Sequence, residues 1–377
     1  MHFEEKLIEY FKWFHKNPEL SYEEYATTEK IKEILDKEGV EILPCTLETG
    51  LVAIIRGAKK GPIQALRCDI DALPIREETG LSYASKYEGK MHACGHDFHI
   101  VVGIGCAVLL NEKKEQMEGT VKIIFQPAEE TSLGALKILE TDVMDDVERI
   151  WGIHADPTND VGTVGLREGA VTAAVDHFVV TVKGKGCHGA HPDDGQDPIP
   201  AAASMIQAFQ TIVTRNINAF HPALVSVTRM QAGNTWNVIP ETAQLEGTVR
   251  TMDREDRSLF EQRLKEIAGY TAMSYGLTAE VQWIAGPPAT MNDAEMVNVS
   301  MEKAGKLGLR VVPEESSMGG DDFAFLEQQI PGCYLKVGTG KGQLIHQPGF
   351  MVDLRVIMLT VKYVTELLAS GHRIVNF

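Results

Sequence analysis

The sequence predicts an α/β protein in which a mostly parallel sheet, covered by helices, is interrupted by a smaller inserted domain. Short apolar runs alternate with helical stretches over the first half of the chain, a pattern typical of parallel strands joined by helices. From Val175 onward, longer strands with alternating polarity replace this pattern. The length of 377 residues also favours two domains over one.

The chain begins with two predicted helices. Apolar residues recur at helical spacing on one face of the first: Phe3, Leu7, Tyr10, Phe11 and Phe14. Asn17-Pro18 ends this helix. Ser21 and Glu24 have the spacing of a capping box, which predicts a second helix that ends near Gly39.

Short apolar runs then predict the strands of the large sheet. They are Leu51–Arg56, Ile63–Cys68, Val121–Phe125 and Ile150–His154. Helical stretches at Phe98–Leu110 and Leu133–Glu140 separate most of these runs. Such alternation predicts a mostly parallel sheet covered by helices.

The middle of the chain predicts a separate unit with the order β-α-β-β-α-β. Its elements are Val175–Lys183, Pro198–Thr214, Ala223–Met230, Ala243–Thr251, Glu255–Ser274 and Thr278–Trp283. This order is that of a ferredoxin-like unit. After Pro287-Pro288, helical and strand patterns resume to the C-terminus. We therefore assign residues 1–174 and 287–377 to one discontinuous domain, and residues 175–286 to the inserted one.

Composition excludes several classes of partner. The net charge of −17 argues against binding to nucleic acid or an anionic membrane, because both require a basic surface. The longest apolar run, Ile100–Leu110, is shorter than the roughly 20 residues of a membrane-spanning helix. The acidic start, Met1–Glu5, differs from a signal peptide. Six scattered cysteines indicate free thiols and predict a cytoplasmic location.

The segment Met91–His99 contains the strongest local signal for a metal. In an extended loop His92, Cys94 and His96 would point the same way, because side chains alternate. A thiolate and an imidazole two residues apart are credible ligands for a zinc-like ion. The alternative is a histidine-rich loop with one buried cysteine.

Further candidate ligands follow other predicted strands. Glu129 and Glu130 come directly after the strand that ends near Phe125, where open α/β sheets bind ligands. Taken alone, this pair is better explained as a solvated acidic pair at a helix start. His154 and His346 also lie at strand ends or in loops, where a single histidine is more often structural. Together they form a set that suits a pair of transition-metal ions: Cys94, His96, Glu130, His154 and His346.

Six motifs occur in an order and spacing that point to a known family. They are Arg67–Pro74, Met91–Asp97, Gln126–Glu130, Asn237–Pro240, Gly319–Phe323 and the closing His346. With them the whole chain resembles the aminoacylase and carboxypeptidase G type of metallo-amidohydrolase. It is similar to the branch of hippurate hydrolase, N-acetyldiaminopimelate deacetylase and plant auxin-conjugate hydrolases.

The resemblance implies a role for each matching position. The five candidate ligands would hold two divalent ions (Zn, Mn, Co or Ni), and Glu129 would be the general base for a metal-activated water. Asp71 would orient groups near the ligands. His188 would stabilise the oxyanion, and with Asn237 and Arg250 it would contact substrate, partly from the neighbouring subunit. The inserted domain would then be a dimerisation and lid domain.

Two departures from the family pattern affect the expected substrate preference. Cys187 and Gly189 flank His188 where the family often has glycine and alanine, and Asp321 stands where it often has glutamate. Neither removes a candidate ligand. Without the family match, Arg250 would be better explained as a strand residue in a surface ion pair.

The sequence therefore predicts a homodimeric, metal-dependent amidohydrolase, or a higher dimer-based oligomer, that cleaves the amide bond of small N-acyl amino acids. One alternative is a dipeptidase or carboxypeptidase that uses the same site. A second is a non-catalytic dimer that binds a metal or a metabolite, against which the retained Glu129 argues.

Overall fold

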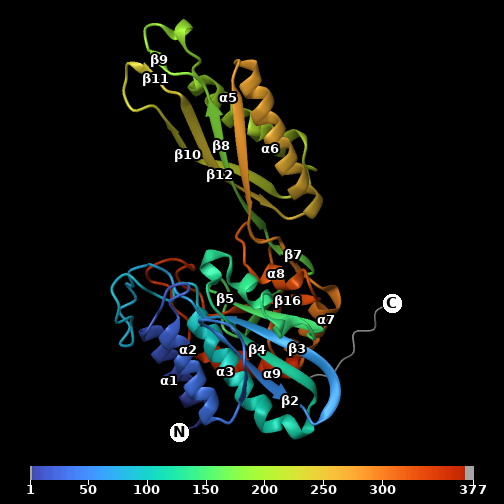
Figure 1. Ribbon diagram of the computed structural model, residues 1–377. Helices are drawn as coiled ribbons and strands as arrows, with labels where there is room; N and C mark the ends of the chain where they lie inside the picture. Colours follow the sequence, from blue (N-terminus) through green and yellow to red (C-terminus); the bar gives the residue numbers. More distant parts are fainter. Residues whose placement is uncertain (1, 370–377) are drawn as a thin grey trace. The chain divides into compact units, whose positions relative to one another are not determined.

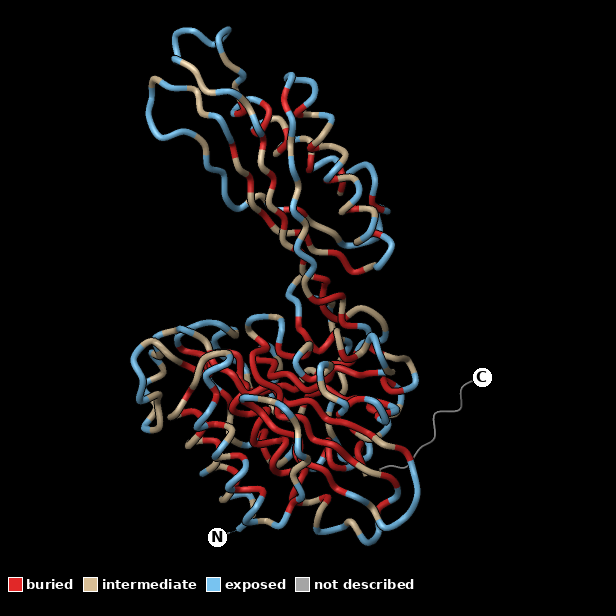
Figure 2. Tube along the Cα trace, in the orientation of Figure 1, coloured by how far each residue is buried: buried red, intermediate tan, exposed pale blue. Residues whose placement is uncertain are grey.

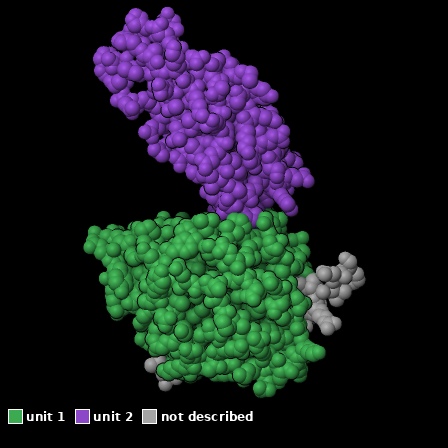
Figure 3. All heavy atoms as spheres, viewed as in Figure 1, with its two compact units in different colours: residues 1–171, 290–315, 321–377 green, residues 172–289, 316–320 purple. Residues whose placement is uncertain are grey.

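The computed structural model describes residues 2–369 (Figure 1). Contacts divide the chain into two compact units, shown in two colours in Figure 3. Unit 1 contains the described residues up to Val171, together with Thr290–Glu315 and those from Asp321 onward. Unit 2 contains Thr172–Ala289 and Ser316–Gly320. Among residues 2–369, no helix is long and apolar enough to cross a membrane.

Unit 1 is built on an eight-stranded sheet. In spatial order its strands are β1 (Glu41–Leu43), β2 (Leu51–Arg56), β4 (Glu118–Gln126), β3 (Lys59–Asp69), β5 (Arg149–Asp156), β16 (Gly332–Gly338), β6 (Thr163–Leu166) and β15 (Arg310–Pro313). The four central strands β4, β3, β5 and β16 are parallel, as are β6 and β15, while the other three pairings are antiparallel. A short ladder pairs β7 (Gly169–Thr172) with β14 (Thr290–Asn292). The predicted α/β fold is confirmed.

Helices cover both faces of this sheet. The unit contains α1 (Phe3–Lys16), α2 (Tyr25–Lys37), α3 (His96–Lys113), α4 (Gly134–Leu139), α7 (Ala294–Lys306), α8 (Phe323–Glu327) and α9 (Arg355–Leu368), with short 3₁₀ turns η1 (Lys114–Gln116), η2 (Glu129–Thr131) and η3 (Asp142–Met144). Alternate residues of β2 pack on opposite sides: Ala53 with α1, α3 and α9, and Val52 with α4 and α8. Figure 2 shows the resulting buried centre in red.

Unit 2 has a four-stranded antiparallel sheet with two long helices. Its elements are β8 (Ala174–Lys183), β9 (Cys187–His188), η4 (Pro192–Asp194), α5 (Pro198–Arg215), β10 (Ala223–Ala232), β11 (Val238–Ile239), β12 (Thr242–Thr251), α6 (Arg254–Ser274) and β13 (Thr278–Ala285). The sheet order is β10-β12-β8-β13, and β9 pairs with β11 beside it. Residues of β8 alternate between buried and half-buried, because α5 and α6 pack on one face only. The main elements follow the predicted β-α-β-β-α-β order.

The predicted capping box before α2 is wrong. Glu24 precedes this helix, but its buried carboxylate accepts a hydrogen bond from Ala128 N at 2.8 Å. Ser21 Oγ instead donates to Asp71 Oδ2 at 2.7 Å. Burial, and after it the charge of Asp71, raises the pKa of Glu24 to about 7. Both side chains therefore bond across the tertiary structure rather than to the helix end, which the local spacing could not reveal.

Candidate metal centre and active site

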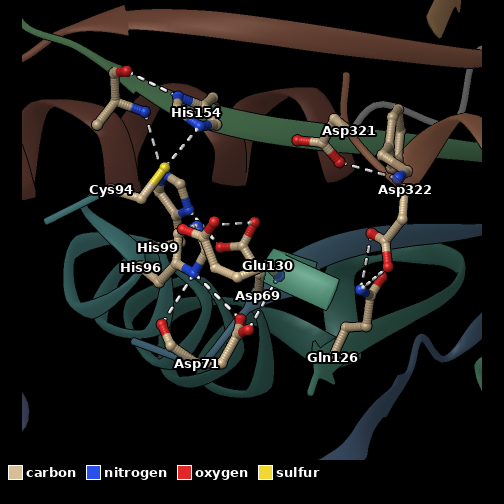
Figure 4. A network of polar contacts seen from close by, with 12 residues as sticks. Asp69, Asp71, Cys94, His96, His99, Gln126, Glu130, His154, Asp321 and Asp322 are labelled. Atoms are coloured by element: carbon tan, nitrogen blue, oxygen red, sulfur yellow. Dashed lines mark hydrogen bonds and ion pairs between the residues drawn. The ribbon is translucent and has the colours of Figure 1, made fainter. Parts of the chain in front are cut away.

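The candidate site lies at the edge of the unit 1 sheet where its central parallel strands end (Figure 4). Gln126 is the last residue of β4, and the turn η2 that follows carries Glu129 and Glu130. His154 lies near the end of β5, and His96 is the first residue of α3. Because parallel strands share one carboxyl edge, side chains distant in the sequence meet there.

The structure brings all five predicted ligands together around Cys94. Its Sγ lies 3.4 Å from His154 Nε2 and 3.3 Å from His346 Nε2. Glu130 Oε1 lies 3.5 Å from His346 Nε2 and 4.0 Å from His96 Nε2. The donor atoms form two three-residue groups, Cys94–His96–His154 and Cys94–Glu130–His346, each within 4.8 Å. Both groups share the thiol of Cys94.

Hydrogen bonds at the far side of two imidazole rings fix their orientation. His96 Nδ1 donates to Asp71 O at 2.9 Å, and His154 Nδ1 donates to Ala155 O at 2.8 Å. In the neutral form of each ring, the Nε2 lone pair therefore faces the cluster. His96 Nε2 and Glu130 Oε1 are buried and have no hydrogen-bond partner. Since orphaned buried polar atoms are costly, this donor set fits a bound transition-metal cation.

Negative charge is in surplus around the cluster. The carboxylates of Asp69, Asp71 and Glu129 are buried, as are those of Asp321 and Asp322. Burial would lower the pKa of His96, but the charges of Asp69 and Cys94 raise it well above its usual range. Burial also raises the pKa of Glu130, to about 7. A site that crowds acids in this way is electrostatically suited to divalent cations.

Glu129 lies beside the candidate ligands, at the start of the turn η2. Its carboxylate is buried and lies within 4.8 Å of the donor atoms of His96 and Glu130. The preceding Ala128 adopts a left-handed conformation with φ of 57°. Burial, followed by the charges of Asp321 and Asp322, raises the pKa of Glu129 well above its usual range. This environment suits a carboxylate that accepts and returns a proton.

Asp71 contacts two of the candidate ligands. Its Oδ1 lies 3.2 Å from His96 Nδ1, and its Oδ2 accepts a hydrogen bond from Glu130 N at 3.0 Å. Ser21 Oγ holds the same Oδ2. Asp71 therefore orients the imidazole of His96 and holds the backbone of Glu130. An orienting role is what the resemblance implies for it.

Sequence reasoning missed Arg67 and His99, which lie behind the ligands. His99 Nδ1 donates to Asp69 Oδ1, its Nε2 accepts from Ala155 N at 3.0 Å, and its ring stacks on that of His96. Arg67 is fully buried and pairs with Asp69 and Asp322. Two signals could have identified them: His99 is one helical turn beyond His96, and Arg67 interrupts an apolar strand, where a buried cation needs partners.

The extended-loop interpretation of residues 91–97 is wrong. The chain turns at Ala93 and Cys94, Gly95 is left-handed with φ of 91°, and α3 starts at the next residue. His92 is buried, and burial lowers its pKa to about 4, so its imidazole is neutral. The turn, rather than an alternating strand, determines how Cys94 and His96 are presented.

Two of the predicted substrate residues meet in unit 2. His188 in β9 pairs with Val238, the residue after Asn237, and Gly189 N donates to Asn237 O at 2.8 Å. His188 is exposed, whereas Asn237 is half-buried. A cavity of about 930 Å³ adjoins them, lined by residues that include His188, Asn234 and Gln244.

Arg250 lies elsewhere in unit 2. It is half-buried near the end of β12, where its Nε donates to Met318 O and its Nη1 to Val249 O, both at 3.1 Å, and Nη1 also bonds Thr248 Oγ1. Burial lowers its pKa. Within residues 2–369 it forms no salt bridge, so the surface ion pair considered as an alternative is absent from the described structure.

Comparisons with known proteins show the family of the chain. Residues 65–370 match the model described as Peptidase family M20/M25/M40. The chain belongs to this family. It is 44% identical over 366 residues to an N-acetylcysteine deacetylase of Bacillus subtilis (strain 168), covering 97% of this chain and 96% of that protein. It is 37% identical over 365 residues to thermostable carboxypeptidase 1 of Saccharolobus solfataricus, covering 94% and 93%.

A solved structure is similar over the same extent. The crystal structure of a Bacillus subtilis protein, described as a dinuclear metal binding peptidase from the M20 family, matches with a TM-score of 0.89 and 42% identity, and the match covers 97% of this chain and 98% of that one. The resemblance predicted from the motifs is therefore confirmed. The protein is a metal-dependent hydrolase of the amidohydrolase and metallopeptidase type, and this membership argues against the non-catalytic alternative.

Proposed function

We propose that this M20 enzyme hydrolyses the amide bond of N-acyl amino acids, with two transition-metal ions in the site. The observation that carries the proposal is the donor set whose two groups share the buried Cys94 thiol, next to the buried carboxylate of Glu129. The ions would be held by Cys94, His96, Glu130, His154 and His346. The similarity to an N-acetylcysteine deacetylase supports an acyl-amino-acid substrate.

Each residue of the site has a separate role in the proposed reaction. A bound pair of ions supplies Lewis acidity, which acidifies water and polarises the amide carbonyl. Glu129 takes the proton from the attacking water and returns it to the leaving amine. His188 donates a hydrogen bond to the developing oxyanion, a contribution of about 3 kcal/mol in comparable sites. Asp71 keeps His96 and Glu130 in place throughout.

We propose that Arg250 binds the carboxylate of the substrate's amino-acid portion, assisted by Asn237. The guanidinium forms a planar fork that suits a carboxylate, and its described partners are neutral groups. Asn237 adds a neutral hydrogen bond.

We further propose that the enzyme is a homodimer, associated through unit 2, in which His188 acts on substrate bound by the partner subunit. Gln244 lines the cavity beside His188, and Arg250 lies six residues farther along β12. At about 3.3 Å per residue the two ends are about 20 Å apart, which exceeds the length of a small N-acyl amino acid. One substrate therefore reaches both groups only if they come from different subunits.

A complementation experiment tests the shared site. Glu129→Ala and His188→Ala proteins, each inactive alone, are unfolded and refolded as an equal mixture. If His188 acts in the partner's site, each mixed dimer regains one intact site, and about a quarter of wild-type activity returns with random pairing. No recovery despite proven mixed dimers would rule out the shared site.

The substrate class is tested by amine release from acetyl-, benzoyl- and indoleacetyl-amino acids. Activity is expected to disappear with a chelator and to return with Mn²⁺, Co²⁺, Ni²⁺ or Zn²⁺. Metal analysis of active protein should show two ions per chain. A dipeptidase or carboxypeptidase is the second candidate, favoured by the similarity to the Saccharolobus enzyme. Faster cleavage of free dipeptides than of any acyl-amino acid would select it.

We also propose a reducing, cytoplasmic environment. All six cysteines are free thiols, and four of them are buried: Cys68, Cys94, Cys106 and Cys333. Oxidation of Cys94 would remove the donor that both ligand groups share. Retention of six titratable thiols in protein isolated under non-reducing conditions would support this location.

A further inference from the structure

A single carboxylate holds both ends of the loop that carries the candidate base. Residues 127–134 run from the end of β4 to the start of α4 and contain Glu129 and Glu130. Asp322 Oδ2 accepts a hydrogen bond from Ala135 N at 2.8 Å, at the far end of this loop. Gln126 Nε2, at the near end, donates to both Asp322 oxygens at 2.9 and 3.0 Å (Figure 4).

A buried arginine fixes this carboxylate in turn. Arg67 Nη2 donates to Asp322 Oδ1 at 2.6 Å, and Arg67 Nε donates to Gln126 Oε1 at 3.0 Å. Because the three side chains are fully buried, protein partners rather than bulk solvent hold each group.

The same arginine connects this arrangement to a candidate metal ligand. Arg67 Nη1 donates to Asp69 Oδ2, and Asp69 Oδ1 accepts from His99. His99 Nε2 accepts from Ala155 N, and Ala155 O accepts from His154 Nδ1. Hydrogen bonds thus run without a break from the loop of Glu129 to the imidazole of His154.

The loop itself needs such support. Ala128 and Ser132 have φ values of 57° and 60°, in the left-handed region that residues other than glycine rarely adopt. Such conformations persist only where surrounding contacts hold them. Glu129 lies between the two strained residues, so its position depends on how this loop is held.

We propose that Asp322 is a positioning residue. By accepting hydrogen bonds at both ends of loop 127–134, it fixes the position of Glu129 relative to the candidate ligands. Arg67 connects Asp322 to His154 through the hydrogen bonds described above. The role given to Glu129 rests on the proposed function, whereas the effect of Asp322 on the loop does not. A displacement of a reacting group by about 1 Å costs on the order of 10²-fold in rate. Loss of Asp322 should therefore reduce turnover without reducing substrate affinity.

The test compares Asp322→Ala, Asp322→Asn and a matched control, Glu327→Gln. Glu327 is the last residue of α8, the short helix that Asp322 precedes, and its carboxylate accepts a hydrogen bond from Met291 N at 2.8 Å rather than from the loop. Amide hydrogen exchange of residues 127–135 is measured without substrate. It should accelerate about tenfold in Asp322→Ala, less in Asp322→Asn, and remain unchanged in Glu327→Gln.

Steady-state kinetics with the best acyl-amino acid complete the test. For Asp322→Ala we expect kcat to fall about 100-fold while KM stays within about threefold, and for Glu327→Gln neither constant should change. If Asp322→Ala does not fold, Asp322→Asn is used instead. This variant keeps an acceptor for Ala135 N but loses the charge paired with Arg67. It should then show smaller changes of the same sign in loop exchange and in kcat.

Two results would overturn the inference: unchanged exchange of the loop, or faster exchange with an unchanged kcat. Failure of the proposed function is recognised separately. If no acyl-amino acid is cleaved, the substrate proposal falls, while the exchange measurement still decides whether Asp322 holds the loop.

Discussion

The candidate site of unit 1 and the candidate substrate residues of unit 2 differ in how their polar groups are held. Asp71 and His96 are buried, and a chain of tertiary hydrogen bonds surrounds them. In contrast, His188 is exposed and Asn237 is half-buried, and their side-chain bonds are local, to Ala190 N and to Thr235 Oγ1. The first region is organised before any ligand arrives, whereas the second can adjust to one.

The physical reason for this difference is desolvation. A polar group removed from water must find a protein partner or lose about 1–3 kcal/mol, so buried groups accumulate in complete sets. An exposed group can bond to water at little cost, and a surface pair contributes only about 0–1 kcal/mol. Substitutions should therefore have larger effects in the buried region than in the exposed one.

The largest effect is expected for the adjacent acids of unit 1. Glu129→Gln should keep the metals but lower kcat by about 100-fold or more, because the proton acceptor is gone. Glu130→Gln should instead lower metal occupancy, since a charged ligand is replaced. Parallel measurement of turnover and bound metal separates the two, and near-normal turnover in Glu129→Gln would remove it from the catalytic role.

A second effect concerns the buried ion pairs of His15, which lies behind the site. Its Nδ1 is 2.6 Å from Asp97 Oδ2 and its Nε2 is 3.1 Å from Glu77 Oε1. Burial lowers its pKa, but the hydrogen bonds and charges of both acids outweigh this and raise the pKa to about 9. A raised pKa gives stability that is present below about pH 6.5 and is lost as the pH rises through 9.

The free energy of unfolding of wild type relative to His15→Gln should accordingly fall by about 3 kcal/mol between pH 6 and pH 10. Denaturant titration at the two pH values measures it. The matched control is His177→Gln in unit 2, where the half-exposed His177 pairs with Glu246. That substitution should change stability by less than about 1 kcal/mol at either pH. A pH-independent difference for His15→Gln would contradict the assignment.

The smallest effect is expected for Arg250 in unit 2. Arg250→Ala should raise KM about tenfold, corresponding to the loss of a charge-assisted hydrogen bond of about 1.5 kcal/mol, with little change in kcat. For the wild-type enzyme, KM should rise by a similar factor when the substrate carboxylate is converted to an amide. Arg250→Ala should have the same KM for the substrate with a free carboxylate and for its amide. A lower KM of this variant for the free carboxylate would exclude Arg250 from carboxylate binding.

The sequence by itself predicted the order of the main helices and strands and the candidate ligands of the site. Hydrophobic periodicity is a local property, so β2 was predicted at its observed bounds and α5 within one residue. The order of units followed from the change in that pattern at Val175. Cys94 and His96 were identifiable because their types and spacing suit a metal, whereas Glu130, His154 and His346 became candidates only as a set and through the family resemblance. The structure brings all five together.

Only the tertiary structure decided which groups hydrogen-bond to the candidate ligands and hold them in place. The bond from Arg67 to Asp322 joins residues 255 positions apart, and no local pattern predicts it. Ser21 and Glu24 do not form the predicted helix cap, because they bond to Asp71 and to Ala128 N instead. The chain also forms a turn at Cys94 where an extended loop was predicted. In each case the cause is burial, because a polar group without water takes whichever partner the folded chain brings near, regardless of its distance in sequence.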